Sequence, residues 1–115
     1  MKHANSRYFE RRSAAALRRL GRLGPFVAAS LCCVKHRCGN PACRCAAGEQ
    51  HPSWRLTYKD KRQKTVTVYV PVDMLEEVRQ WVSNHRALKK LAAEISDAQL
   101  QRVRRHVAEK RRRTR

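Results

Sequence analysis

Acidic residues are scarce in this chain of 115 residues. It contains nine aspartates and glutamates against 27 lysines and arginines, so its formal net charge is +18 at pH 7 with histidine neutral. A protein this positive attracts polyanions, and DNA, RNA and anionic membrane surfaces are the classes of partner to consider. Among these we expect nucleic acid, with DNA ahead of RNA, and no membrane.

Long apolar runs are missing as well. No stretch approaches the roughly 20 apolar residues that a membrane-spanning helix needs. The apolar run 24–34 is short, contains Pro25 and follows several arginines, so we do not expect it to be a secretory signal. We therefore expect a cytoplasmic protein, whose cysteines more often bind metal than form disulfides. The cysteine count of five is odd, which excludes a complete internal set of disulfides.

The sequence motifs of common enzyme classes are also absent. The chain has no glycine-rich phosphate loop, no nucleophile elbow and no pair of carboxylates at a useful spacing. Glu49 is the one carboxylate near the cysteine-rich segment, and no second acid or base accompanies it. We therefore expect neither an enzyme nor a small-molecule substrate.

One segment carries candidate site chemistry. It contains Cys38, Cys43, Cys45 and His51 in the spacing C-x4-C-x-C-x5-H, with glycine and proline between them for tight turns. Three thiolates and one imidazole match the ligand set of a closed tetrahedral zinc site. We predict a structural zinc knuckle, and the alternative is a group of free thiols in a reducing compartment. The reserve ligands are Cys32, Cys33 and His36.

Two runs after this segment, 54–58 and 65–70, alternate apolar and polar side chains and are rich in β-branched and aromatic residues. This pattern is typical of strands, and the polar segment 59–64 between them predicts a hairpin. The run 26–37 is too short for periodicity to distinguish a strand from a helical turn. The apolar faces that we expect to form a small core comprise Trp54, Leu56 and Tyr58 on the first strand and Val66, Val68 and Val70 on the second.

The C-terminal half predicts helices. Apolar residues recur at three- and four-residue steps over 73–95, and Asp73 is a good N-cap. Ser96 begins a second capping pattern, which predicts another helix from about 97 to 110, although a kink, a helical hairpin or no break also fits the pattern. The first 23 residues predict a basic, partly helical arm.

These elements together predict an α+β fold. A zinc knuckle and a two- or three-stranded antiparallel sheet would pack on the first part of a long helix, and a second helix would follow. We expect three segments: a basic arm over 1–25, the knuckle, hairpin and long-helix domain over 26–95, and a basic C-terminal helix and tail over 96–115.

The favoured function is non-catalytic nucleic-acid binding through phosphate contacts. The tyrosines Tyr58 and Tyr69 either stack on bases or are half-buried strand residues. The alternative is a protein-interaction module that dimerises or binds a partner through the apolar stripe of the helix over 73–95. The candidate phosphate-binding residues are Arg37, Arg44, Arg55, Lys59, Lys61, Arg62, Lys64, Arg102, Arg104, Arg105, Arg111, Arg112 and Arg113.

Several motifs follow one another in a recognisable order: Ser30-Leu31, the Cys-Gly-Asn-Pro-Ala-Cys-Arg-Cys knuckle, His51-Pro52, the aromatic strand, Tyr69-Val70-Pro71 and a helix with Trp81. This order resembles a bacterial family of small proteins of unknown function, often encoded beside transposase and other mobile-element genes. The resemblance covers about residues 30–95 and leaves the two basic ends outside. It implies the fold and an accessory role beside a transposase or integrase, and it implies no mechanism.

Overall fold

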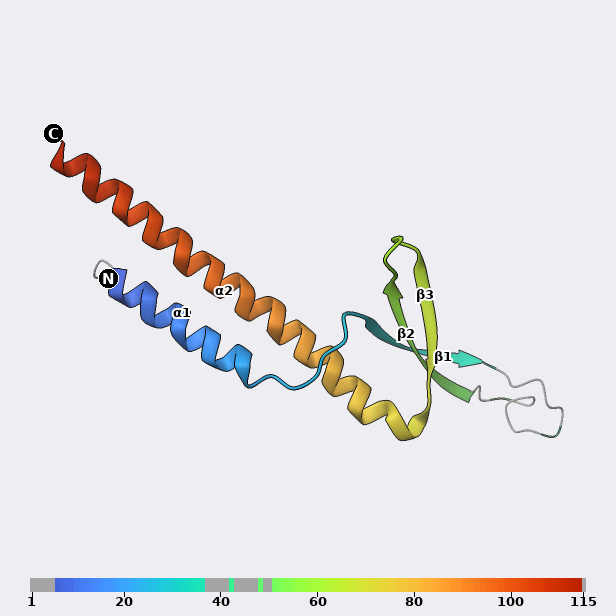
Figure 1. Ribbon diagram of the computed structural model, residues 1–115. Coiled ribbons are helices and arrows are strands. Elements are labelled where there is room, and N and C mark those ends of the chain that lie inside the picture. The colour runs from blue at the N-terminus through green and yellow to red at the C-terminus, as the bar shows by residue number, and fades with distance from the viewer. Residues whose placement is uncertain (1–5, 37–41, 43–47, 49–50, 115) are drawn as a thin grey trace. The chain divides into compact units, whose positions relative to one another are not determined.

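The computed structural model describes residues 6–36, 42, 48 and 51–114. The helices and strands follow one another as α1 (Ser6–Gly21), β1 (Ser30–His36), β2 (His51–Lys59), β3 (Thr65–Val70), the short 3-10 helix η2 (Val72–Met74) and α2 (Leu75–Arg113) (Figure 1). The sheet has the order β1-β2-β3, and both strand pairs are antiparallel. The predicted α+β class is confirmed, with a three-stranded sheet and a long C-terminal helix.

The chain divides into two compact units. The sheet unit spans residues 25–85, and the helical unit combines residues 1–24 with 86–115. The first part of α2 belongs to the sheet unit and the remainder to the helical unit. The predicted N-terminal arm and the predicted C-terminal segment therefore fall within the same unit.

The core of the sheet unit lies between the sheet and the start of α2. Val70 is 3% exposed, Val78 is 2% exposed and Val82 is 6% exposed, and Trp54 and Leu56 pack against them. The alternation along β2 and β3 places Trp54, Leu56 and the valines of β3 on one side of the sheet, because successive strand residues point to opposite faces. Val68 was predicted for this core but is 43% exposed. The predicted packing of the hairpin on the first part of the long helix is confirmed.

The segment that leads into β1 is held on α2 by polar contacts. The buried Asn84 side chain donates a hydrogen bond to the Pro25 carbonyl at 2.8 Å and accepts one from Gln80 at 2.8 Å. The backbone N–H of Val27 donates to the Trp81 carbonyl at 3.2 Å. These contacts fix where the chain enters the sheet, and the run 26–37 that periodicity left open forms a strand from Ser30.

The helical unit is a pair of antiparallel helices. Phe9, Ser13 and Ala16 are the buried residues of α1 and recur at steps of four and three, as one face of a helix requires. Leu91 and Ala98 are buried on α2, and Ala98 is 0% exposed. Each helix therefore buries an alanine, Ala16 on α1 and Ala98 on α2.

Two ion pairs join these helices. Arg12 pairs with Asp97 at 3.1 Å, and Arg102 pairs with Glu10 at 3.0 Å. The second pair lies farther toward the C-terminus on α2 and farther toward the N-terminus on α1 than the first pair, as antiparallel helices require. Each pair is partly exposed, so each contributes on the order of 0.2–1 kcal/mol.

Two predicted helix boundaries are wrong. The predicted second C-terminal helix is not a separate element. Of the alternatives at Ser96, the structure has no break, and α2 is continuous from Leu75 to Arg113. Asp97 pairs with Arg12 instead of capping a new helix, and no glycine or proline interrupts the segment. Asp73 is also not the N-cap, because it lies inside η2, which Pro71 precedes.

Within the part of the chain that the structure describes, no helix is both long enough and apolar enough to cross a membrane.

Candidate nucleic-acid interface

A single carboxylate organises the turn between β2 and β3. Asp60 Oδ1 accepts hydrogen bonds from the backbone N–H groups of Arg62 at 2.8 Å and Lys64 at 3.0 Å. The backbone N–H of Gln63 donates to the Asp60 carbonyl at 2.9 Å, and the backbone N–H of Asp60 donates to the Lys64 carbonyl at 2.9 Å. Gln63 has a φ of 65°, a conformation that glycine adopts at the lowest cost. The turn therefore has a defined shape although it contains no glycine.

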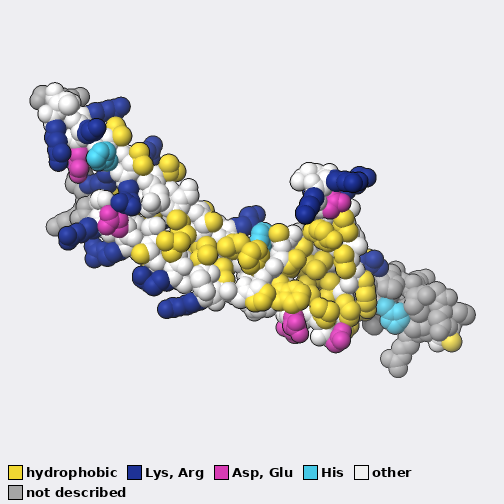
Figure 2. Space-filling view, in the orientation of Figure 1, with side chains coloured by type: hydrophobic (Ala, Val, Ile, Leu, Met, Phe, Trp, Pro, Cys, Tyr) yellow, Lys and Arg dark blue, Asp and Glu magenta, His cyan; other side chains and the backbone are white. Residues whose placement is uncertain are grey.

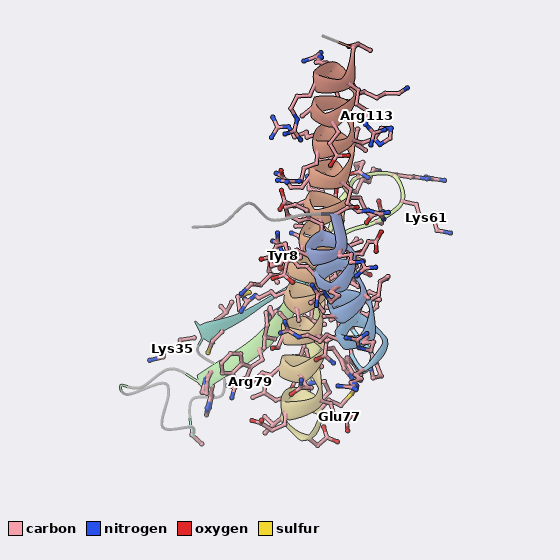
Figure 3. The ribbon with its side chains drawn as sticks, turned by 90° about the vertical axis from the view of Figure 1, so that its left-hand side faces the viewer. Tyr8, Lys35, Lys61, Glu77, Arg79 and Arg113 are labelled. Carbon is pink, nitrogen blue, oxygen red and sulfur yellow. The ribbon has the colours of Figure 1, made fainter. Side chains whose placement is uncertain are left out.

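This turn presents cations to solvent. Lys61, Arg62 and Lys64 are exposed, as is Lys59 at the end of β2. Lysine and arginine side chains gather at the tip of the hairpin in Figure 2, and Lys61 points away from the loop in Figure 3. Among the described residues, these four cations enter no ion pair. The carboxylate of Asp60 accepts its hydrogen bonds from backbone N–H groups, and no ion pair joins it to a described lysine or arginine.

The strand register places the two candidate tyrosines on opposite sides of the sheet. Tyr58 pairs with Val66 on the side of the sheet that faces α2, and it is half-buried. Tyr69 pairs with Arg55 on the other side and is 58% exposed. Arg55, a candidate phosphate-binding residue, is half-buried beside it on the central strand. The half-buried alternative therefore describes Tyr58 and not Tyr69.

The predicted basic residues of the C-terminal segment have different environments. Arg104, Arg111, Arg112 and Arg113 are exposed and Arg105 is half-buried. Arg102 donates to Glu10 at 3.0 Å and to the Gln99 side chain at 3.5 Å, so its guanidinium joins the two helices. The candidate residues did not include the exposed arginines of α1, which lie away from the buried face formed by Phe9, Ser13 and Ala16; they are Arg7, Arg11, Arg18 and Arg19. Arg22, directly after α1, is also exposed.

Most of the predicted zinc knuckle lies outside the described residues. This applies to Cys38, Cys43 and Cys45, and also to the neighbouring Arg37 and Arg44. The fourth predicted ligand, His51, is the first residue of β2 and is the register partner of His36 at the end of β1. The β1–β2 pairing therefore holds the two ends of segment 37–50 together.

The reserve cysteines lie next to each other in β1 and are both exposed. Cys32 and Cys33 point to opposite faces of the sheet, so they cannot both bind one ion without a change in the strand. Cys32 Sγ lies 3.6 Å from the Arg55 carbonyl, to which it donates. Among the described residues, no three or more His, Cys, Asp and Glu side chains lie together in a group that could hold a metal ion.

The apolar stripe of the long helix is divided between the two units. Val78 and Val82 are buried in the core of the sheet unit, and Leu91 is buried in the helical unit. Exposed apolar residues occur farther along α2, where Leu100 and Val103 are each 60% exposed and Val107 is 39% exposed.

Comparison with known families identifies the domain. The family model described as Domain of unknown function (DUF6788) matches residues 8–80, more than half of the chain. The match begins in α1 and ends within α2, so it includes a helix that the resemblance had left outside. No curated protein and no solved structure matches the chain. The chain therefore belongs to the DUF6788 family.

Proposed function

We propose that this protein binds nucleic acid without catalysis and contacts phosphates through lysine and arginine side chains. The observation that carries the proposal is the β2–β3 turn, in which Asp60 fixes the backbone while Lys61, Arg62 and Lys64 remain exposed. A pre-shaped cationic turn loses little conformational freedom when it meets a phosphate backbone. The exposed arginines of α1 and of the end of α2 give the helical unit a second basic surface.

The net charge of +18 supports the same proposal. Cations that neutralise phosphates release condensed counterions, which is the main driving force of binding that does not depend on sequence. We further propose that the setting implied by the resemblance, an accessory role beside a transposase or integrase, applies to this chain.

We also propose that zinc stabilises segment 37–50, with Cys38, Cys43, Cys45 and His51 as ligands. The support is the chemistry of this donor set and the antiparallel pairing of His36 with His51, which brings the ends of the segment together. Zinc would contribute free energy to folding, and it has no part in a reaction.

A salt series tests the proposed function. Labelled duplex DNA, single-stranded DNA and RNA of equal length are titrated with the full chain, and binding is followed by fluorescence anisotropy. We expect log K to fall linearly with log salt concentration, with a slope of about −0.9 for each duplex phosphate contacted and about −0.7 for each single-strand phosphate. Binding that is no stronger at low salt than at high salt would contradict the proposal.

Two double variants with the same charge change locate the contact surface. Lys61→Ala with Lys64→Ala alters the turn, and Lys89→Ala with Lys90→Ala removes two exposed lysines of α2. If both turn lysines contact phosphate, the slope of log K against log salt becomes less negative by about 1.8 on a duplex or about 1.4 on a single strand. The control pair should change the slope much less. Equal effects would mean that only net charge matters and that the turn is not a contact surface.

Protein interaction is the second candidate, but not through the predicted stripe over 73–95, whose Val78, Val82 and Leu91 are buried. The exposed apolar residues lie farther along α2, where Leu100, Val103 and Val107 recur at steps of three and four. This spacing suits pairing with another helix. Arginines such as Arg104 and Arg111 occur beside the stripe, so two copies would repel each other, and salt should strengthen their association. Light scattering across the same salt series distinguishes the candidates, because nucleic-acid binding weakens with salt whereas dimerisation strengthens.

A further inference from the structure

The side of the sheet that does not face α2 presents a continuous set of side chains. Its central row is Cys32, Arg55 and Tyr69, which are direct partners across β1, β2 and β3. The adjacent row toward the turn is Ser30, Thr57 and Thr67. We refer to these two rows as the open face. Four of its six residues are exposed, and only Arg55 and Thr57 are half-buried.

Tyr69 is the unusual residue of this face. It is 58% exposed on the edge strand β3, whereas the core residues of the sheet unit lie on the opposite side. An exposed aromatic ring on the surface of a sheet can stack on an unpaired base, because every base has a π face. Its direct partner on the central strand is Arg55, and side chains at opposite positions have Cβ atoms about 5 Å apart. A guanidinium at that distance can contact the phosphate or the edge of a base that stacks on the ring.

The remaining groups of the open face suit the same ligand. Ser30, Thr57 and Thr67 supply hydroxyl groups that both donate and accept hydrogen bonds. The next pair toward the turn is Lys59 and Thr65, so the described residues on this side of the sheet carry positive charge and no carboxylate. Beyond Lys59 and Thr65 lies the β2–β3 turn, whose exposed lysines and arginine can contact the phosphates of the same strand.

We propose that the open face binds single-stranded nucleic acid, with one base stacked on Tyr69 and the adjoining backbone directed toward Lys59 and the β2–β3 turn. This inference rests on the proposed nucleic-acid binding and adds the class of ligand. In a duplex the faces of the bases are already stacked on their neighbours, so Tyr69 would contribute little to duplex affinity. An unstacked strand instead gains a π contact together with phosphate contacts.

Substitutions at Tyr69 test the inference without changing the charge of the protein. An oligothymidine of about 15 nucleotides and a duplex of equal length are titrated at constant salt. We expect Tyr69→Leu, which keeps apolar bulk but lacks a π face, to lower single-strand affinity about 5- to 150-fold, the range found for loss of one base stack. Tyr69→Phe keeps the ring and should retain affinity within about threefold, and both variants should bind the duplex as the natural chain does.

Tyr8→Leu is the matched control, because Tyr8 is also an exposed tyrosine, at 46%, but lies on α1 in the other unit. It should leave single-strand affinity unchanged. Circular dichroism and urea unfolding verify that each variant is folded. If Tyr69→Leu is unstable, Tyr69→Val replaces it, because valine also lacks a π face and suits the strand β3. A Tyr69→Leu loss that is equal on both ligands, or no loss on the single strand, overturns the inference but leaves the proposed function intact. Absence of binding to every nucleic acid overturns both.

Discussion

The role of Asp60 in the β2–β3 turn can be separated from its charge. Asp60→Asn and Asp60→Ala each remove one negative charge, so the two variants attract polyanions equally at long range. They differ in the turn, because both backbone hydrogen bonds end on the same oxygen, Oδ1. Asparagine retains an acceptor oxygen at this position and alanine does not. The comparison therefore isolates the geometry of the turn.

The expected magnitude follows from those two bonds. A typical intramolecular hydrogen bond contributes about 0.5–1.5 kcal/mol, and both donors are backbone groups in a turn that water can reach. We therefore expect Asp60→Ala to lower the free energy of unfolding by about 1–2 kcal/mol, and Asp60→Asn to lower it by less than about 1 kcal/mol. Gln63 has a positive φ that the intact turn maintains, so loss of the bonds also frees the segment that carries Lys61 and Lys64.

Loss of the two Asp60 hydrogen bonds should also weaken the binding of nucleic acid. The loosened turn of Asp60→Ala must be ordered again when it meets phosphate, which costs about 1–2 kcal/mol for each residue whose backbone is fixed. We expect Asp60→Asn to bind nucleic acid at least as tightly as the natural chain and Asp60→Ala to bind about 5- to 30-fold more weakly than Asp60→Asn. Urea unfolding and fluorescence anisotropy at one salt concentration give both quantities. Equal stability and equal affinity of the two variants would refute the argument that Asp60 shapes the turn for binding.

Three further predictions concern other parts of the chain. Cys43→Ser should lower the zinc content of protein purified without chelator and destabilise the sheet unit, whereas well under one zinc per chain in the natural protein would contradict the proposed knuckle. Ala98→Leu should cost about 1–3 kcal/mol by overpacking the contact between α1 and α2, and faster hydrogen exchange in α1 would report it; the exposed Ala92→Leu serves as its control and should have little effect. Gln63→Gly should raise the free energy of unfolding by up to about 1 kcal/mol because glycine tolerates the positive φ, and a decrease would show that the conformation carries no strain.

Local patterns predicted most of the elements. Alternation identified the strands over 54–58 and 65–70, and three- and four-residue spacing identified the long helix. The errors occurred where a tertiary contact replaced a local one. Ser96 and Asp97 have the chemistry of a helix start, but Asp97 pairs with Arg12, which is distant in sequence, and the adjacent Ala98 is fully buried. A capping pattern cannot reveal that a residue has a partner elsewhere in the chain.

The sequence also predicted part of the candidate interface: it showed where the cations lie, but not the contacts that shape the turn. The basic hairpin loop was evident in the sequence, because its lysines and arginines occur in a polar segment between two strands. The hydrogen bonds of Asp60 and the positive φ of Gln63 were not evident, because a turn without glycine has no strong local signature. Arg102 resembles the other arginines of the basic segment, and only its contact with Glu10 separates it from them.

By itself, the sequence determined the excess of positive charge, the α+β composition and the amphipathic face of each main element, because charge and periodicity are properties of neighbouring residues. The tertiary structure decided which side chains remain available to a ligand. Alternation alone placed Tyr58 on the predicted apolar face and Tyr69 on the opposite one, but only the structure shows that Tyr69 pairs with Arg55 and is 58% exposed. The physical reason is that the strand register and the burial of one face by α2 depend on contacts between segments that are distant in sequence.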